Sequence, residues 1–151
     1  MANALTDMAR AMFARGEIDW VNGTFKAVLL DTFGVSFATV NQTGVGVPAN
    51  LALIPQTYRD NGASSFAGMP LVTSVLDNGA CDADDVTFTA VQTISTSGSA
   101  LEAVVIYMVG VSEALSPVIA WLDTATGLPI VPNGGDIICT FDQGSNRLFR
   151  L

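Results

Sequence analysis

The sequence contains no histidine, and this absence removes most common catalytic and zinc-binding sites from consideration. Ser-His-Asp and Cys-His nucleophilic sites need an imidazole base, and the usual zinc sites need imidazole ligands. Two acidic stretches, Asp31-Thr-Phe-Gly and Asp123-Thr-Ala-Thr-Gly, come closest to an aspartic-protease motif. Both miss the Asp-Thr-Gly or Asp-Ser-Gly pattern that such a pair of carboxylates requires. We therefore predict no catalytic residues and no enzymatic activity.

A cluster of aspartates between residues 77 and 85 offers the hard oxygen ligands that Ca²⁺ prefers. The cluster consists of Asp77, Asp82, Asp84 and Asp85. Its spacing lacks the twelve-residue order and the terminal glutamate of an EF-hand loop. Asx-turns before a strand account for the same residues, and we favour that interpretation. The sequence therefore predicts no metal site, with calcium binding kept as the alternative.

The two cysteines and one glycine-rich turn complete the search for chemistry. Cys81 and Cys139 lie far apart in the sequence, and we predict two free thiols, with a disulfide as the alternative. Without a neighbouring histidine, neither thiol has an evident base that would make it a nucleophile. Asn133-Gly-Gly135 lacks the lysine and the following helix of a phosphate-binding loop. We therefore predict no cofactor.

The composition indicates one domain, residues 1–151, that makes apolar contacts with partners. Half of the residues are apolar and 13% are charged, about half the usual charged fraction. So few charges leave apolar area exposed for interfaces, including contacts between copies of the chain. The net charge is −8 and the basic residues are scattered, so we expect neither direct nucleic-acid binding nor attraction to anionic membranes. No apolar run reaches the ~18 residues that span a bilayer.

The first 16 residues predict a short amphipathic helix. Thr6 is its expected N-cap, and Gly16 follows its expected end. The helix packs either on its own sheet or on a neighbouring subunit, and the sequence leaves both open. Its apolar residues recur at helical spacing: Leu5, Met8, Met12 and Phe13.

The rest of the chain predicts a mainly β protein, an antiparallel β-sandwich or small barrel. Asn22-Gly23 predicts a type I′ hairpin turn within residues 18–31, followed by a strand that is apolar on both faces. Turn residues separate the later candidates at fairly regular spacing. These further strands are expected over residues 71–76, 86–91, 100–109, 118–123, 137–141 and 148–151.

Residues 33–70 interrupt this pattern with glycines and prolines, which predicts a long irregular loop. Its apolar residues argue against disorder, so we interpret it as an extended arm that packs on something. The candidate interface residues come from this arm and from the N-terminal helix: Met8, Met12, Phe13, Leu51, Leu53, Ile54, Tyr58 and Phe66.

The large aromatic residues leave one binding function open. Trp20, Trp121, Tyr58 and Tyr107 could stack on sugars or bases, but their strand-like context favours core or interface anchors. A carbohydrate-binding module that exposes Trp121 or Trp20 is therefore an alternative to a structural protein.

The order of several segments resembles a widespread group of small structural proteins encoded by tailed bacteriophages. The likeness covers residues 16–31 and 71–151 well and the middle loop poorly. The segments are Gly-Glu-Ile-Asp-Trp-Val-Asn-Gly-Thr-Phe-Lys-Ala-Val-Leu-Leu-Asp (16–31), Gly-Ala-Cys-Asp-Ala-Asp-Asp-Val-Thr-Phe (79–88), Val-Ile-Tyr (105–107), Ser-Pro-Val-Ile-Ala-Trp-Leu-Asp (116–123), Gly-Gly-Asp-Ile-Ile (134–138) and Asn-Arg-Leu-Phe (146–149).

This resemblance implies a non-enzymatic virion component with a β-rich fold, assembled in the host bacterial cytoplasm. One placement is a capsid decoration or cement protein whose partner is the major capsid protein. The other is a component of a neck, tail or baseplate ring that contacts other virion subunits. A helical N-terminus and a long loop suit a clamp that bridges several subunits, and we favour the cement protein.

Overall fold

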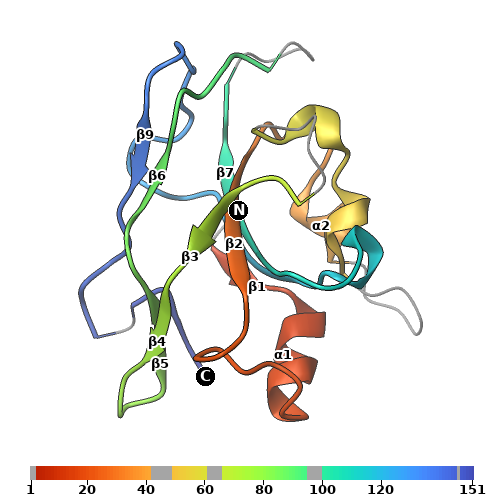
Figure 1. The fold of residues 1–151 in the computed structure, drawn as a ribbon, viewed down its shortest axis with the longest axis vertical. Coiled ribbons are helices and arrows are strands. Elements are labelled where there is room, and N and C mark those ends of the chain that lie inside the picture. Colours follow the sequence, from red (N-terminus) through yellow and green to blue (C-terminus); the bar gives the residue numbers. More distant parts are fainter. Residues whose placement is uncertain (1–2, 42–48, 61–65, 95–99, 146) are drawn as a thin grey trace.

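The protein is mainly β, with antiparallel sheets that form a sandwich-like fold (Figure 1). The computed structural model describes residues 3–41, 49–60, 66–94, 100–145 and 147–151. Within these ranges the sheets stay open, so the sandwich prediction is confirmed and the barrel alternative is not.

The elements are short, and their bounds follow. The helical elements are α1 (Asp7–Ala14), α2 (Phe37–Val40) and the 3₁₀ turns η1 (Leu51–Leu53), η2 (Gln56–Tyr58) and η3 (Glu113–Leu115). The strands are β1 (Ala4–Leu5), β2 (Phe25–Leu30), β3 (Met69–Leu71), β4 (Thr73–Val75), β5 (Ala80–Ala83), β6 (Val86–Phe88), β7 (Ala103–Met108), β8 (Val118–Leu122), β9 (Ile137–Cys139) and β10 (Phe149–Arg150).

A five-stranded sheet in the order β1-β8-β7-β2-β3 forms the centre of the molecule. β2 and β7 pair along their whole length, from Phe25 opposite Met108 to Leu30 opposite Ala103. Alternate residues of β2 enter two different cores, Ala27 on one face and Val28 on the other. The prediction that this strand is covered on both sides is therefore confirmed.

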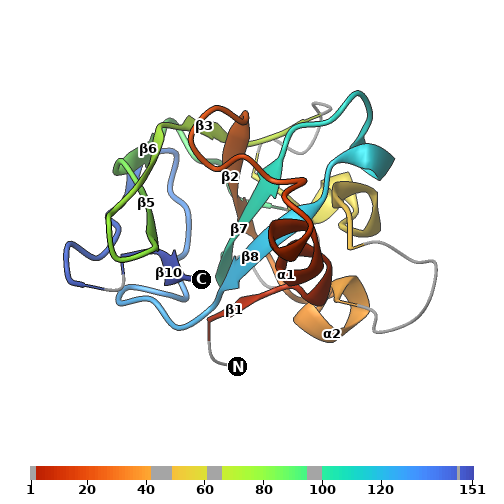
Figure 2. The same ribbon diagram turned by 90° about the horizontal axis from the view of Figure 1, so that it is seen from below.

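One face of the central sheet, here called the sheet-covered face, packs against two smaller sheets. These have the orders β10-β5-β4 and β6-β9, and Figure 2 shows β5, β6 and β10 beside the central strands. Trp20 joins the layers, because its ring centroid lies 4.4 Å from that of Phe25 in β2 and 5.0 Å from that of Phe149 in β10. The last strand thus closes the core through an aromatic contact.

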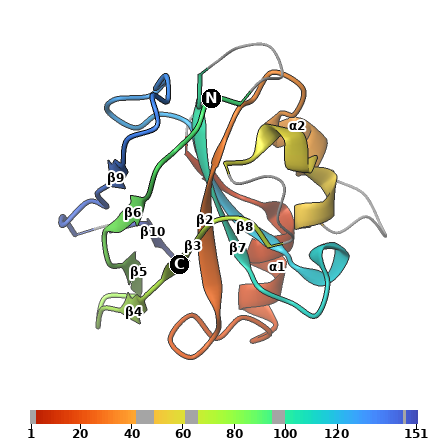
Figure 3. The same cartoon turned by 45° about the horizontal axis from the view of Figure 1, so that its top comes forward.

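The opposite face, here called the loop-covered face, lies under α2, η1, η2 and η3 (Figure 3). Its core includes Val35, Val40 and Ala67 from the segment between β2 and β3, packed on Val105 and Trp121 of the sheet. The prediction of an extended arm is therefore wrong for the described part of residues 33–70, which folds back onto its own sheet. Residues 42–48 and 61–65 of that stretch lie outside the described residues.

Helix α1 confirms the prediction for the N-terminus. Thr6 caps it, since its hydroxyl accepts a hydrogen bond from the Ala9 amide at 3.0 Å and donates to the Val118 carbonyl at 2.6 Å. Gly16 follows the helix with a φ of 70°, a left-handed conformation that favours glycine. Met8 packs with the core of the loop-covered face and Met12 with that of the sheet-covered face, so α1 packs on its own sheet.

The hairpin prediction at Asn22-Gly23 is wrong. The chain turns around Asp19, whose carboxylate accepts hydrogen bonds from the Val21 and Asn22 amides. Residues 15–24, between α1 and β2, contain no strand that could form the first half of a hairpin. Gly23 has no positive φ, and its amide donates to the Asp19 carbonyl at 2.8 Å. A Cβ at Gly23 would lie 2.6 Å from that carbonyl oxygen, so close approach and not turn type explains the glycine.

Most later strands form where the sequence predicted them, with two differences. The strand expected over residues 71–76 breaks at Val72, where the chain passes from the central sheet to the sheet of β4. The aspartate-rich stretch holds a strand, β5, which places Cys81 opposite both Val75 and Phe149. This strand was not predicted because it has only four residues, contains Asp82 and lies between the turn-forming residues Asp77 and Asp84.

Candidate functional site

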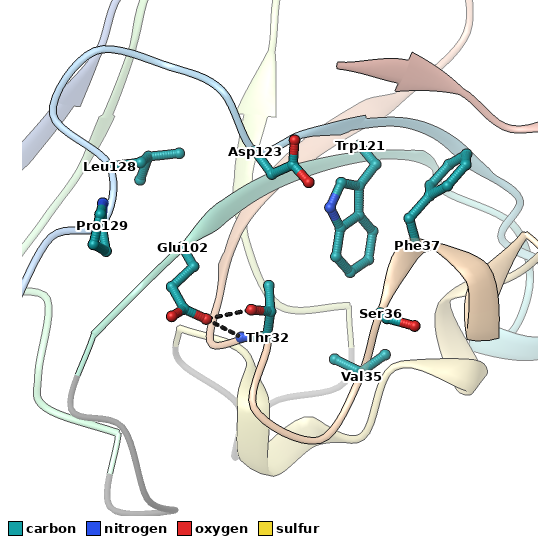
Figure 4. A pocket seen from close by; sticks show the side chains of 9 residues that line it. All are labelled: Thr32, Val35, Ser36, Phe37, Glu102, Trp121, Asp123, Leu128 and Pro129. Atoms are coloured by element: carbon teal, nitrogen blue, oxygen red, sulfur yellow. Dashed lines mark hydrogen bonds between the residues drawn. The ribbon is translucent and has the colours of Figure 1, made fainter. Parts of the chain in front are cut away.

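A pocket of about 350 Å³ opens beside the loop-covered face and carries two carboxylates, Glu102 and Asp123 (Figure 4). It forms where the chain leaves β2 and β8, next to the turn at Leu128 and Pro129. Its remaining lining residues are Thr32, Val35, Ser36, Phe37 and Trp121.

Glu102 is already engaged within the protein. One of its carboxylate oxygens accepts hydrogen bonds from the Thr32 amide, at 3.2 Å, and from the Thr32 hydroxyl, as Figure 4 shows. The Glu102 amide in turn donates to the Leu30 carbonyl at 2.8 Å, so this residue fixes the chain where it leaves β2. Glu102 therefore shapes the pocket, and the residues around it include no histidine base.

Both tryptophans are core residues. Trp121 is 2% exposed and Trp20 is 3% exposed. Phe37 meets Trp121 edge-on, with ring centroids 6.3 Å apart, and the Trp20 indole donates to the Asp82 carbonyl at 2.9 Å. Neither ring has a free face for a sugar, so the carbohydrate-binding alternative loses the two residues on which it depended.

The aspartates that suggested calcium serve the backbone and one ion pair. Asp85 accepts a hydrogen bond from the Phe141 amide at 2.9 Å, and Asp82 accepts one from the Ala83 amide. Asp82 also lies 3.4 Å from the Arg147 guanidinium. Among the residues that the structure describes, no three His, Cys, Asp or Glu side chains come close enough to hold a metal ion.

The two cysteines are free thiols, as predicted, and both are poor nucleophiles. Burial raises the pKa of the Cys81 thiol to about 11. Burial and the nearby Asp85 carboxylate raise the pKa of Cys139 to about 11 as well. Cys139 lines a groove of about 550 Å³ beside β9, and its raised pKa keeps the thiol protonated and weakly nucleophilic at neutral pH.

The sequence did not predict the buried ion pair between Arg59 and Glu113, which has the charge and burial of a candidate functional site. The Arg59 side chain is 1% exposed, and one of its nitrogens donates to Glu113 at 2.6 Å. A second nitrogen donates to the other Glu113 oxygen at 3.1 Å, and further bonds go to backbone carbonyls, at 2.7 Å for Leu51 and 2.8 Å for Ile54. Arg59 is the only basic residue between Lys26 and Arg147, and that isolation was the available signal.

Glu113 extends this network to the next part of the chain. It accepts a hydrogen bond from the Phe66 amide at 3.0 Å as well as those from Arg59. The hydrogen bond from Arg59 is the main cause that lowers the pKa of the Glu113 carboxyl, and burial opposes it. The pair therefore ties η1, η3 and the segment before β3 together, which is a structural role.

The candidate interface residues separate into two groups. Leu51 and Ile54 are fully buried against their own sheet, and Leu53, Tyr58 and Phe66 are partly buried against the same core. Phe13 lies in the aromatic cluster, 5.7 Å from Phe149 by ring centroids. Met8 and Met12 line an open depression.

That depression is an apolar groove of about 240 Å³ between α1 and η3, here called the α1–η3 groove. Leu115, which is 63% exposed, and Pro117 form its far side. Arg15 and Glu17 lie at its rim and pair with each other at 2.6 Å. The sequence predicted the methionines but not η3, because residues 113–115 show no clear helical pattern.

Comparisons with known proteins add no assignment to this geometry. No helix among the described residues is long and apolar enough to cross a membrane. The chain matches neither a protein-family model nor a curated protein.

Proposed function

We propose that this chain is a non-enzymatic structural protein of a tailed-bacteriophage particle, most specifically a capsid decoration protein. In this role it binds neighbouring major capsid subunits at the surface of the virion and stabilises them. The resemblance of the ordered segments at residues 16–31 and 71–151 supplies the class of protein.

The observation that carries the proposal is a surface poor in charge and rich in exposed apolar side chains. Only 13% of the residues are charged, while Phe33, Leu115 and Ile138 are each more than half exposed. Such side chains gain free energy when a partner covers them, at roughly 25 cal/mol per Å² of apolar area. A protein that functions as part of a larger assembly is expected to have this kind of surface.

The test is to locate the protein in purified particles and to count it there. A decoration protein is expected at a copy number in the hundreds, bound to the capsid and released without loss of the tail. A count that matches a single small ring supports the neck, tail or baseplate alternative, because ring components follow one cyclic symmetry axis. Complete absence from washed particles overturns a virion role.

A further inference from the structure

A single aromatic side chain stands out on the surface, Phe33, in the loop that follows β2. Its side chain is 70% exposed. The backbone beneath it is fixed, since the Phe33 amide donates to the Asp31 carboxylate at 2.8 Å and the Asp31 amide donates to the Tyr58 carbonyl at 2.9 Å. An exposed phenyl ring on an ordered backbone offers apolar surface that a partner can cover.

Gly34 shows how tightly this loop is packed against the rest of the molecule. A Cβ at Gly34 would lie 2.2 Å from the Tyr58 hydroxyl oxygen, so the backbone runs directly over the tyrosine ring. The loop therefore presents Phe33 in one arrangement before any partner arrives. Such preorganisation lowers the conformational entropy that binding must overcome.

The α1–η3 groove has the size and chemistry to receive this ring. Its apolar lining consists mainly of Met8, Met12, Leu115 and Pro117, and its volume is about 240 Å³. An apolar cavity of about 150 Å³ can hold a benzene molecule, so one phenyl group fits here. Methionine sulfur atoms also make favourable contacts with aromatic rings.

The ring and the groove lie at opposite ends of the β2–β7 pair. Phe33 follows the end at which Leu30 pairs with Ala103, and η3 follows the end at which Phe25 pairs with Met108. A strand of six residues spans roughly 17 Å at about 3.3 Å per residue, so the two features cannot meet within one chain. Figure 1 shows the same separation, with α1 at the opposite end of β2 from the loop that leaves it.

The charges around the ring and around the groove are compatible with a contact between two copies. Residues 27–58 contain no basic residue, while Asp31 and Glu102 lie next to Phe33. The groove lies on α1, where Arg10 and Arg15 are exposed and each is paired with a carboxylate. This end is thus close to neutral in a chain of net charge −8, and an acidic loop meets less repulsion there.

We propose that Phe33 of one copy inserts into the α1–η3 groove of a second copy. The contact is heterologous, because each copy uses a different surface, and it therefore continues into a ring or an open filament. This inference goes beyond the proposed virion role and does not rest on it.

The test measures self-association of the full chain by sedimentation velocity across a range of concentrations. We expect the unaltered protein to form oligomers, and Phe33→Ala to weaken the association constant at least about tenfold. Leu115→Glu is expected to have the same effect from the groove side. Val72→Ala is the matched control, because Val72 is 68% exposed but belongs to neither surface.

A mixture of Phe33→Ala and Leu115→Glu separates this arrangement from a symmetric one. The first variant keeps an intact groove and the second keeps an intact Phe33, so together they form one productive contact and stop at a 1:1 complex. Unchanged melting temperatures for both variants show that they fold. A monomeric parent protein, full association by Phe33→Ala, or a mixture that stays monomeric each overturns the proposal.

Discussion

The two faces of the central sheet are covered in different ways, and they differ in how their backbone is satisfied. On the sheet-covered face, β4, β5, β6, β9 and β10 form ladders in which backbone groups bond to each other. On the loop-covered face, short turns leave carbonyl groups that no ladder reaches. Buried carbonyls need a donor, so irregular cover requires polar side chains inside the protein.

Several side chains supply these donors on the loop-covered face, and Arg59 and Tyr107 are two that are buried. Arg59 donates to the carbonyls of Leu51 and Ile54, and the Tyr107 hydroxyl donates to the Ala67 carbonyl at 2.7 Å. Burial raises the pKa of Tyr107 above its ordinary value, which keeps the hydroxyl proton in place as a donor. We therefore expect the loss of a buried polar side chain to lower the free energy of unfolding more on this face than on the other. Truncation of a buried apolar side chain is expected to lower it equally on both faces.

The largest difference between the faces is expected at Arg59. Replacing Arg59 with Met removes the charge partner of Glu113 and two carbonyl donors from a site that is 1% exposed. Breaking a buried pair in this way lowers the free energy of unfolding by about 4 kcal/mol. Urea denaturation measures the loss.

Arg147→Met is the matched control on the sheet-covered face. Arg147 pairs with Asp82 at 3.4 Å, with its side chain 20% exposed. Water remains near this pair, so we expect a loss of about 1 kcal/mol or less. Equal losses for the two variants contradict the idea that only the loop-covered face depends on a buried charge.

The tryptophans test whether apolar burial counts equally on the two faces. Trp121 lies in the core of the loop-covered face and Trp20 in that of the sheet-covered face. Because both rings are almost fully buried, we expect each Trp→Ala substitution to lower the free energy of unfolding by about 3 kcal/mol. A loss confined to one of them in thermal or urea unfolding shows that one core contributes far less than its burial indicates.

The same contrast explains how much of the fold the sequence could predict. Strands leave a local signal, since β7 and β8 are apolar runs bounded by turn residues, and helix α1 has a cap and a periodic pattern. The segments that cover the loop-covered face show no such periodic pattern of apolar residues. Contacts with distant strands bury Val35, Leu51 and Ile54. Local sequence patterns do not show such contacts, which is why their segment was predicted to be an arm.

The candidate sites were harder to predict for a related reason. Met8 and Met12 could be found because helical spacing places them on one face. Their groove needs Leu115 and Pro117, which lie more than 100 residues later and arrive there only through the pairing of β1 with β8. The turn around Asp19 was missed because Asn-Gly is also compatible with close backbone approach, which sequence spacing does not show.

Tyr107 offers a smaller test of the polar requirement. Tyr107→Phe keeps the ring and removes the hydroxyl that donates to the Ala67 carbonyl. We expect the free energy of unfolding to fall by about 1.5 kcal/mol, measured by urea denaturation. Tyr58→Phe is the control, because that ring is only partly buried, and a change of the same size there removes the special role of the Tyr107 hydroxyl.

The smallest expected effect is a pH dependence that belongs to the loop-covered face. Because Arg59 lowers the pKa of Glu113 in the folded protein, the resulting stability is fully present above the unfolded pKa of about 4.3. It is lost as the pH falls through the lower folded value, where protonation leaves the buried guanidinium without its anion. Unfolding free energies measured from pH 6 downward, in steps of about half a unit, should therefore fall less steeply in Glu113→Gln than in the parent protein.

Glu17→Gln is the control for this pH dependence. It removes an exposed partner of Arg15 and should leave the slope almost unchanged, because water screens that pair. If both variants flatten the acid slope equally, the pH dependence comes from the surface and not from the buried pair.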